Sequence, residues 1–333
     1  MASTVLTIDE AEALVSERLR AARTGPEQAA SVARALVGAE RVGQSGHGLR
    51  RLPAYAAQAA SGKVDGWAIP VVERTRPGVL AIDACHGFAY PALDRAVAAL
   101  PSLTRAQGVA VAGIRRSHHA GVAGLTVEAL AEAGVVALFF ANTPAAMAAA
   151  GGTTAVFGTN PIAFAAPIPA EDPIVVDLSL SLVARGKVMA AAQQGLPIPE
   201  GWALDAAGEA TTDAEAALAG TMLPFGGAKG AALALMVEAL AAIAGAALAA
   251  EATSFFSADG APPGTGQLIL AIDPAAFGRD GAGRVARLAH LIEADPEARL
   301  PGRRRQALRA ERDAAGIAVE DALLSEIRDV VRA

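Results

Sequence analysis

Residues 108–141, GVAVAGIRRSHHAGVAGLTVEALAEAGVVALFFA, carry the pattern that decides the fold class. The stretch begins and ends with short β-type runs, and a helical stretch separates them. Two similar runs lie further out along the chain, at Val79–Ile82 and Ile174–Asp177. Because strands that alternate with helices bury their apolar surfaces in one layered core, the sequence predicts a mixed α/β or α+β fold. It does not give the order of the strands.

Two helices are expected near the N-terminus. Each begins with a threonine followed three residues later by a glutamate, Thr7 with Glu10 and Thr24 with Glu27, which is the pattern of a capping box. Apolar residues then recur on one face of each helix, and we expect these faces to pack on a larger body. The apolar positions are Leu14, Val15, Leu19, Val32, Leu36 and Val37.

Composition restricts the class of protein. A chain of 333 residues that is 53% hydrophobic can bury a substantial core. The formal charge is −6, and no basic stripe with interleaved aromatic residues is present, so nucleic acid is not an expected partner. Asp9 and Glu10 lie where a secretory signal would have a basic start and an apolar centre. We therefore expect a cytoplasmic protein.

The segment Ala231–Ala250 is apolar except for Glu238 and is long enough to span a bilayer. Its apolar residues are largely alanine, and a carboxylate in the middle of a membrane is costly, so we expect a buried helix and no membrane partner. Cys85 is the only cysteine, which excludes disulfides and cysteine-based metal clusters. No metal is expected.

No Gly-x-Gly-x-x-Gly follows a predicted strand, so the usual dinucleotide fold has no support in the sequence. Residues 46–55, GHGLRRLPAY, instead bring His47, Arg51 and Tyr55 close together between glycines. Reduction of a 2-oxo acid needs a proton donor for the alkoxide and a cation for the carboxylate, and histidine and arginine supply both. An ordinary loop histidine beside a surface arginine explains the same residues equally well.

This segment resembles the Ser-His-Gly-x-x-Arg-Leu-Pro-x-Tyr signature of the type-2 malate/L-lactate dehydrogenase family, which includes sulfolactate and ureidoglycolate dehydrogenases. Further blocks resemble the family in the family's own order, so that the resemblance covers nearly the whole chain. These blocks are Arg116–Gly124, Phe157–Phe164, Val183–Lys187, Pro199–Asp205 and Gly226–Gly230.

The resemblance implies a sulfolactate dehydrogenase-like NAD(P)-binding fold that is not a doubly wound Rossmann fold, usually in a homodimer. The missing glycine fingerprint agrees with this. Residues 1–65 are expected to pack with residues 285–333 as a helical domain, and residues 66–284 to form an α/β core that binds cofactor and substrate. The implied cofactor is NAD(P)H, and the sequence does not decide between the two forms.

The resemblance also implies roles for individual residues. His47 matches the proton donor and acceptor, and His119 is a second candidate for that role; the sequence leaves the choice open. Substrate contacts are implied for Arg51, Tyr55, Thr159, Asn160 and Arg185. Cofactor contacts are implied for His118, Gly121, Thr143, Asp177, Leu178, Ser179, Lys187, Lys229, Gly230 and Arg303.

Without the resemblance, ordinary turn and strand-end chemistry accounts for most of these positions. Lys229 is a partial exception, because it follows two glycines and precedes a predicted helix, where lysine charge and free amides can meet a phosphate. A solvated lysine at a helix start fits that pattern as well.

Three positions depart from the family pattern. Gly46 replaces the usual serine, although Ser45 precedes it; Ala149–Ala150 replaces the usual Pro-Trp; and Ala228 replaces a histidine before Lys229. These changes put a serine–histidine relay and the orientation of the cofactor in question.

Related activities remain as alternatives. Ala84–Leu93 and Thr265–Leu268 also resemble imine reductases of the same superfamily, which reduce Δ1-piperideine-2-carboxylate and Δ1-pyrroline-2-carboxylate. Those enzymes tend to have His-Gly-Asp where this chain has Arg185-Gly186-Lys187. An acid suits a protonated imine, whereas added cations suit an anionic oxo acid.

Asp177–Lys187 and Ser254–Gly260 are most similar to the sulfolactate dehydrogenase-like members of the family. We therefore expect a small dianionic acid, sulfopyruvate or oxaloacetate, as the oxo substrate, with its 2-hydroxy acid as the product of reduction. A homologue that binds nucleotide but has lost catalysis is the alternative from another class.

Overall fold

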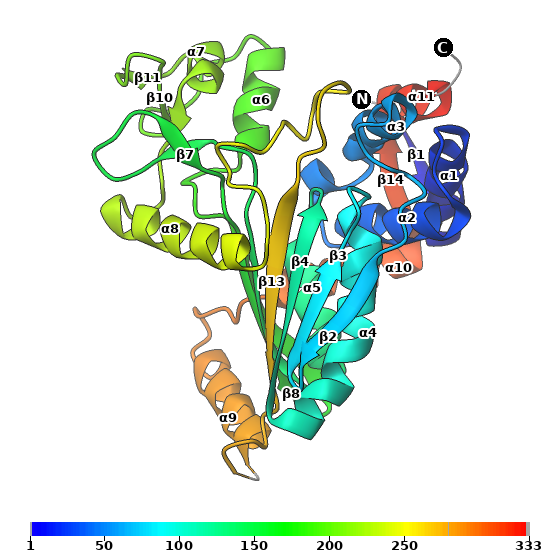
Figure 1. Ribbon diagram of the computed structural model, residues 1–333, viewed down its shortest axis with the longest axis vertical. Helices are drawn as coiled ribbons and strands as arrows, with labels where there is room; N and C mark the ends of the chain where they lie inside the picture. Colours follow the sequence, from blue (N-terminus) through cyan, green and yellow to red (C-terminus); the bar gives the residue numbers. More distant parts are fainter. Residues whose placement is uncertain (1, 279, 331–333) are drawn as a thin grey trace.

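The computed structural model describes residues 2–278 and 280–330. At its centre is a large sheet with the strand order β2-β3-β4-β13-β5-β8-β9 (Figure 1). Only β3 and β4 pair in parallel within this described sheet, and the other neighbours are antiparallel. A doubly wound fold would have a mostly parallel sheet, so the expected mixed α/β fold without Rossmann topology is confirmed. The strands are β2 (Val71–Arg76), β3 (Val79–Asp83), β4 (Val109–Ser117), β13 (Thr265–Ile272), β5 (Val136–Ala141), β8 (Ile162–Ile168) and β9 (Glu171–Leu178).

The four β-type runs of the sequence form β3, β4, β5 and β9. β5 shows why one of them is continuously apolar. Phe139 belongs to the main core on one face of the sheet, whereas Phe140 belongs to a second core on the other face. Side chains alternate along a strand, so a strand covered on both faces has no polar positions.

Helices cover both faces of the large sheet (Figure 1). Apolar side chains of α4 (Ala89–Gln107) and α5 (Ala123–Glu132) enter the main core. The opposite face receives α8 (Ala228–Ile243) through the second core. Further down that side, α9 (Gly281–Glu293) packs against Ile168 and Ile174 of β8 and β9.

Segments near the beginning and the end of the chain lie side by side, as Figure 1 shows, because β1 (Ser3–Leu6) pairs antiparallel with β14 (Ile317–Glu320). The main core continues from the N-terminal helices into the large sheet. The predicted division into a helical domain and an α/β core stays a prediction. Around the strand pair lie α1 (Ile8–Ala21), α2 (Pro26–Arg41), two short 3₁₀ helices η1 (Ser45–His47) and η2 (Leu49–Arg51), α3 (Leu52–Ser61), α10 (Arg303–Ala315) and α11 (Asp321–Asp329).

One of the two expected capping boxes forms. Thr7 caps α1 reciprocally with Glu10, whereas α2 begins at Pro26 with Gly25 as its N-cap and no side-chain cap. The prediction for Thr24 and Glu27 is therefore wrong. Proline favours the first helical position, which moves the cap one residue past Thr24 and puts Glu27 out of register. The predicted apolar faces are confirmed: Val15, Leu19, Val32, Leu36 and Val37 are buried, and Leu14 packs against the same core.

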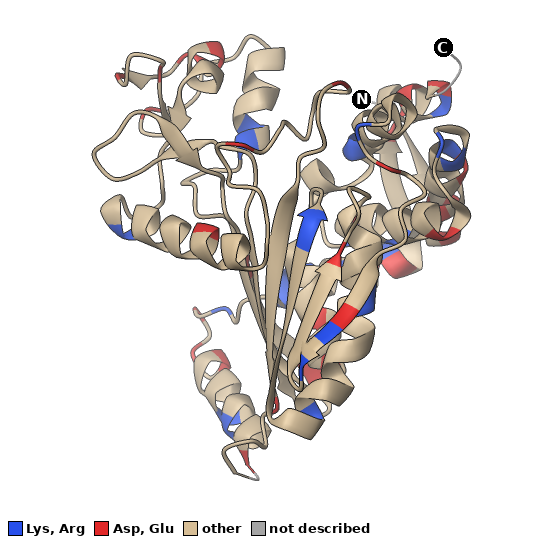
Figure 2. Cartoon of the chain, in the orientation of Figure 1, with Lys and Arg blue, Asp and Glu red and all other residues tan. Residues whose placement is uncertain are grey.

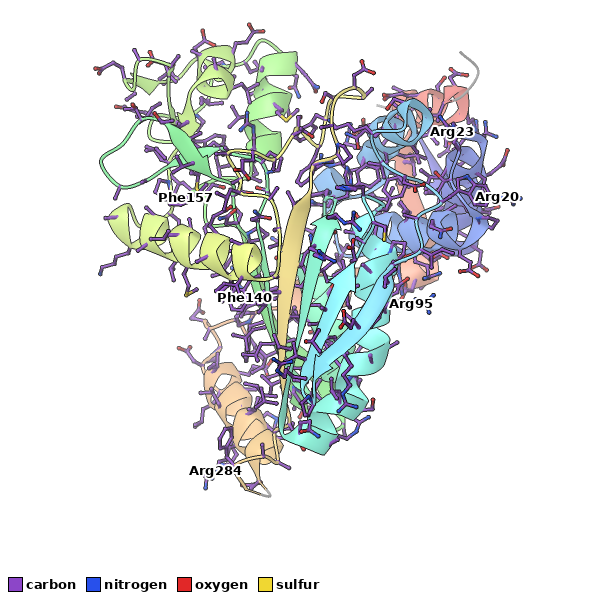
Figure 3. The ribbon with its side chains drawn as sticks, viewed as in Figure 1. Arg20, Arg23, Arg95, Phe140, Phe157 and Arg284 are labelled. Carbon is purple, nitrogen blue, oxygen red and sulfur yellow. The ribbon has the colours of Figure 1, made fainter. Side chains whose placement is uncertain are left out.

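A small lobe lies at the upper left of Figure 1, beyond α8. It packs through the second core, and Figure 3 places Phe140 and Phe157 on this side of the molecule and Arg20 and Arg23 with the N-terminal helices. The lobe holds a sheet in the order β11-β10-β12-β6-β7 and two helices. Their bounds are β11 (Ala210–Thr211), β10 (Ala203–Leu204), β12 (Thr221–Met222), β6 (Met147–Ala148), β7 (Ala155–Phe157), α6 (Arg185–Gln193) and α7 (Ala214–Ala219).

The long apolar segment forms α8, which ends at Ile243. Leu235, Met236 and Ile243 are exposed, so the predicted buried helix is buried along one side only. No helix in the described residues is long and apolar enough to cross a bilayer. Charged residues are scattered over helices and strands in Figure 2, and no continuous basic face is visible in this view.

Candidate active site

A cavity of about 1060 Å³ lies where the small lobe, the η1–η2 segment and one end of the large sheet meet. Segments far apart in the sequence supply its walls, among them the loop between β4 and α5 and the loop before β13. Of the residues singled out in the sequence, those lining it are His47, Arg51, His119, Gly121, Thr143, Thr159, Asp177, Leu178, Ser179, Arg185 and Lys187.

Two histidines and two tyrosines form a hydrogen-bonded chain that ends at this cavity. Nδ1 of His47 lies 3.2 Å from Nε2 of His119, and the hydroxyl of Tyr55 lies 2.6 Å from Nδ1 of His119. The hydroxyl of Tyr90 lies 3.2 Å from that of Tyr55. The imidazoles of His47 and His119 stack at 5.1 Å with an interplanar angle of 16°. Both histidines proposed for proton transfer are thus members of one chain.

Burial sets the protonation states along this chain. Burial, followed by the charges of Arg51 and Arg305, lowers the pKa of His47 to about 4, and burial holds the pKa of His119 well below its usual value. Burial also raises the pKa of Tyr55 to about 12. At neutral pH the imidazoles are therefore neutral and the phenol keeps its proton.

Neutral rings and a protonated phenol are compatible with a chain in which every hydrogen bond is donated toward the cavity. If the protonated Tyr55 donates to Nδ1 of His119, then Nε2 of His119 donates to Nδ1 of His47. Nε2 of His47 then carries a proton and makes no hydrogen bond to the described residues. Since His47 lines the cavity, the chain in this arrangement presents one N–H donor to a molecule bound there.

Arg51 supplies the cation beside this donor. Its Nε donates to the carbonyl oxygen of Gly46 at 2.8 Å, while its Nη1 is buried without a hydrogen-bond partner in the described residues. Its guanidinium carbon lies 4.5 Å above the ring of Phe256. A buried donor without an acceptor is costly, and a ligand carboxylate would satisfy it through charge-assisted hydrogen bonds.

Two adjacent phenylalanines cover the histidines and Arg51. The ring of Phe255 lies 5.3 Å from the ring of His118 and 5.2 Å from that of His119, and Phe256 stacks on Arg51. Both belong to the loop before β13 and line the cavity. They exclude water, which explains why burial dominates the pKa of the histidines.

A buried carboxylate organises the opposite wall. Glu238 of α8 accepts hydrogen bonds from the side-chain amides of Asn142 at 3.0 Å and Asn160 at 2.9 Å, and from the backbone amide of Ala249 at 2.7 Å. Nearby, Thr143 accepts a hydrogen bond from the backbone amide of Thr159 at 2.9 Å. These bonds hold in place the turns that carry both threonines.

The part of the cavity remote from His47 suits an elongated anionic molecule. The N-termini of α5 and α6 open into it, and neither has a side-chain cap in the described residues. Arg185 and Lys187 lie at the start of α6, and Arg305 lies beside the start of α5, paired with Asp177 at 2.9 Å. Free amides, helix dipoles and cations together attract phosphates, so these residues fit the pyrophosphate of a dinucleotide.

Several expected contacts are absent from the cavity wall. Tyr55 and Asn160 are fully buried, behind His119 and against Glu238, and do not line the cavity, so their direct substrate contacts stay predictions. His118 is also buried and bonds to Gln58 at 2.9 Å. Lys229 and Gly230 do begin α8, but away from the cavity of this chain.

Arg305, and not the predicted Arg303, lines the cavity. Arg303 pairs with Glu293 at 2.8 Å and does not line the cavity, whereas Arg305 does. Both belong to the first turn of α10, and residues two apart on a helix point in nearly opposite directions. Arg305 is therefore the residue of this turn that reaches the cavity, and the cofactor contact of Arg303 stays a prediction without support from the cavity lining.

Ser45 does not replace the family serine as a partner of His47. Its hydroxyl donates to Glu40 at 2.9 Å. Among His, Cys, Asp and Glu side chains of the described residues, no group of three or more is placed to hold a metal ion. Four residues at or behind the cavity wall were not predicted from the sequence: Arg305, Phe255, Phe256 and Glu238. The block Ser254–Gly260 was a signal for the phenylalanines, and the single acid in the apolar run Ala231–Ala250 was a signal for Glu238.

Comparison with known proteins identifies the family of the chain. The malate/L-lactate dehydrogenase family model matches residues 6–328. The chain is 48% identical to the (2R)-3-sulfolactate dehydrogenase (NADP(+)) of Chromohalobacter salexigens, with 98% of each chain covered. It is 40% identical to a Delta(1)-pyrroline-2-carboxylate reductase of Ancylobacter novellus, covering 97% of this chain and 96% of the relative.

Solved structures of the same fold are similar to the chain over nearly its whole length. The delta1-piperideine-2-carboxylate reductase of Pseudomonas syringae has a TM-score of 0.92 at 39% identity, with 98% of this chain and 99% of that chain covered. The sulfolactate dehydrogenase of Methanocaldococcus jannaschii has a TM-score of 0.87 at 27% identity, with 98% and 96% covered. The chain therefore belongs to the malate/L-lactate dehydrogenase family and is an oxidoreductase.

Proposed function

We propose that this oxidoreductase interconverts a small dianionic 2-oxo acid and its 2-hydroxy acid with a nicotinamide cofactor. The observation that carries the proposal is the buried, unpartnered Nη1 of Arg51 beside the His47–His119–Tyr55 chain. Arg51 would bind the 2-carboxylate, and His47 would donate to the oxygen of the 2-oxo group. The similarity to the sulfolactate dehydrogenase supports the substrate class.

The bound nicotinamide would supply the hydride. The residues that would hold the cofactor are Gly121 at the start of α5, Thr143, the Asp177–Ser179 segment, Lys187 and Arg305, all of which line the cavity. Lys229 and Gly230 lie outside this cavity, so a role for them in cofactor binding rests on the family resemblance alone.

Proton transfer would run through the chain of rings. As negative charge develops on the substrate oxygen, the proton on Nε2 of His47 would move to it, the Nε2 proton of His119 would move to Nδ1 of His47, and the hydroxyl proton of Tyr55 would move to Nδ1 of His119. The negative charge would then rest on the Tyr55 oxygen until a proton returns from solvent along the same chain. Tyr55 keeps His119 in the tautomer that permits this transfer. The exclusion of water by Phe255 strengthens these hydrogen bonds.

Arg185 favours a second anionic group on the substrate. Among the described residues, its guanidinium donates only to the carbonyl oxygens of Ala145 and Leu218, at 3.3 and 3.4 Å, and burial lowers its pKa. A partly buried cation with long hydrogen bonds and no carboxylate partner in the described residues can accept a sulfonate or a second carboxylate.

Reduction of cyclic imino acids is the second candidate, favoured by the similarity to the Delta(1)-pyrroline-2-carboxylate and delta1-piperideine-2-carboxylate reductases. Against it, Asp177, a carboxylate lining the cavity, is already paired with Arg305. The protonated imine would then meet cations where it needs an acid. The cytoplasmic location and the homodimer stay predictions from the sequence.

The test is the loss of nicotinamide absorbance with NADH and NADPH in parallel, against sulfopyruvate, oxaloacetate, pyruvate and a cyclic imino acid. A kcat/KM higher for a dianion than for pyruvate supports the proposal. Preference for pyruvate would remove the role of Arg185 in recognising a second anion. Activity with the imine alone would establish the second candidate, and cofactor binding without turnover would indicate a catalytically silent homologue.

A further inference from the structure

Lys63 is a buried lysine that the proposed reaction does not use. It follows α3 after Gly62, and the residue is 3% exposed. Its ammonium group donates to the carbonyl oxygen of Ser254 at 2.8 Å, to that of Ser257 at 3.1 Å and to the hydroxyl of Ser257 at 2.8 Å. An ammonium group has three N–H donors, so the loop before β13 satisfies all of them.

The two residues that Lys63 binds stand on either side of Phe255 and Phe256. One ammonium group therefore binds both ends of the short segment that carries the two rings. Phe255 lies against His119 at 5.2 Å, and Phe256 lies under the guanidinium of Arg51 at 4.5 Å. The rest of this loop forms no helix or strand, so side-chain contacts have to fix the position of the rings.

Gln58 reinforces the same attachment from α3. Its amide donates to the carbonyl oxygen of Ser257 at 3.0 Å, and its own carbonyl oxygen pairs with Nε2 of His118 at 2.9 Å. The carbonyl oxygen of Ser257 thus receives donors from both Lys63 and Gln58. The helix that begins beside Arg51 is in this way connected at its far end to the loop that covers Arg51.

We propose that Lys63 is a positioning residue for the active site, which holds Phe255 against His119 and Phe256 against Arg51. The proposal rests on the proposed function only in assigning the substrate carboxylate to Arg51. Without the ammonium group, the carbonyl oxygen of Ser254 loses this donor, that of Ser257 keeps the donor from Gln58, and the loop can move away. Arg51 then loses the ring that orients its guanidinium, and water reaches His119.

The experiment compares Lys63→Met, which keeps the stem of the side chain, with Lys63→Arg, which keeps the charge and donors. Thr253→Val is the matched control, because it removes a hydrogen bond of the same loop that lies outside the segment between Ser254 and Ser257. The Thr253 hydroxyl donates this bond to the carbonyl oxygen of Ala261 at 2.6 Å. The probe is oxalate, an unreactive dicarboxylate, titrated calorimetrically into the full chain saturated with oxidised cofactor.

We expect Lys63→Met to weaken oxalate binding by about two- to thirtyfold, the range that loss of a cation–π contact gives. The KM for the oxo acid should rise by a similar factor, with a smaller change in kcat and an unchanged Kd for the cofactor. Lys63→Arg should lie closer to wild type, and Thr253→Val should match wild type. A purely structural role would lower the Tm and the folded fraction without changing the oxalate Kd of the folded protein.

Wild-type oxalate affinity in folded Lys63→Met would overturn the proposal. If Lys63→Met does not fold, Phe256→Leu takes its place, because Lys63 is proposed to act on Arg51 through the ring of Phe256. Unchanged oxalate affinity in Phe256→Leu would equally overturn the proposal. Failure of the proposed function is seen separately, as wild-type protein that binds oxalate but turns over no oxo acid.

Discussion

Replacement of Tyr55 by phenylalanine tests the hydrogen-bonded chain by removing one oxygen atom. The ring is fully buried and packs near Phe88 and His118 at centroid distances of 5.4 and 5.1 Å. Phenylalanine keeps the volume of the ring, so these contacts remain and no large cavity is created. The hydrogen bonds to His119 and Tyr90 are lost.

The loss leaves Nδ1 of His119 buried without a partner, which costs about 1–3 kcal/mol of stability. The same loss removes the preference for the tautomer that presents N–H at His47. If about 1.4–2.7 kcal/mol of that preference is lost in the transition state, kcat falls about 10- to 100-fold. Substrate and cofactor binding should change little, because Tyr55 does not line the cavity.

The assay is steady-state absorbance of the nicotinamide for kcat and KM, with a fluorescence titration for the Kd of the cofactor. Tyr90→Phe is the control, since it removes a single bond of 3.2 Å and leaves the contact between Tyr55 and His119 intact. Its kcat should stay within about threefold of wild type, less than the factor of ten that 1.36 kcal/mol gives. A Tyr55→Phe protein with wild-type kcat, or a Tyr90→Phe protein that is equally impaired, would refute the reasoning.

Three further outcomes are expected. His47→Ala should lower kcat by about 10²–10⁴-fold while the cofactor Kd measured by titration stays at the wild-type value; full activity would move proton donation to His119. Burial lowers the pKa of His47 to about 4 and that of His118 to about 3, so below pH 6.5 the unfolded chain binds protons that the folded chain does not. The free energy of unfolding should therefore fall as the pH drops from about 6.5 to about 4, and urea titrations should show a smaller fall in His47→Ala; an equal fall would contradict the assignment. Glu238→Gln replaces an oxygen that accepts buried amides with a donor and should cost about 2–4 kcal/mol in urea unfolding, whereas the exposed Glu209→Gln should cost almost nothing; equal stabilities would exclude the buried network as a stabilising element.

Local features of this fold could be read from the sequence because they depend on neighbouring residues. The Thr7–Glu10 cap involves atoms within one helical turn, and the apolar runs at β4 and β5 are properties of single strands. The cap predicted at Thr24 failed for an equally local reason, the preference of Pro26 for the first helical position. The order of the large sheet was not readable, because β13 is inserted between β4 and β5 from more than a hundred residues away.

Some residues of the candidate site could likewise be found from the sequence, and others required the tertiary structure. His47, Arg51 and His119 were found as members of sequence blocks, and the structure brings them to one cavity. The choice between Arg303 and Arg305 required the orientation of α10 relative to the cavity. Phe255 and Phe256 needed the path of an irregular loop, and nothing in their own sequence states which side chains they cover.

The sequence by itself therefore indicated four strands of the large sheet, the two N-terminal helices, the family, and the polar residues His47, Arg51 and His119 that line the cavity. Backbone hydrogen bonding, side-chain alternation and motif spacing act over short separations along the chain. The tertiary structure decided which of these residues meet. The hydrogen bond between His47 and His119, the pairing of Arg305 with Asp177 and the attachment of Lys63 to Ser254 and Ser257 join residues far apart in sequence. Such contacts depend on the packing of the whole chain, because desolvation and hydrogen-bond geometry are set only when distant segments close around the same cavity.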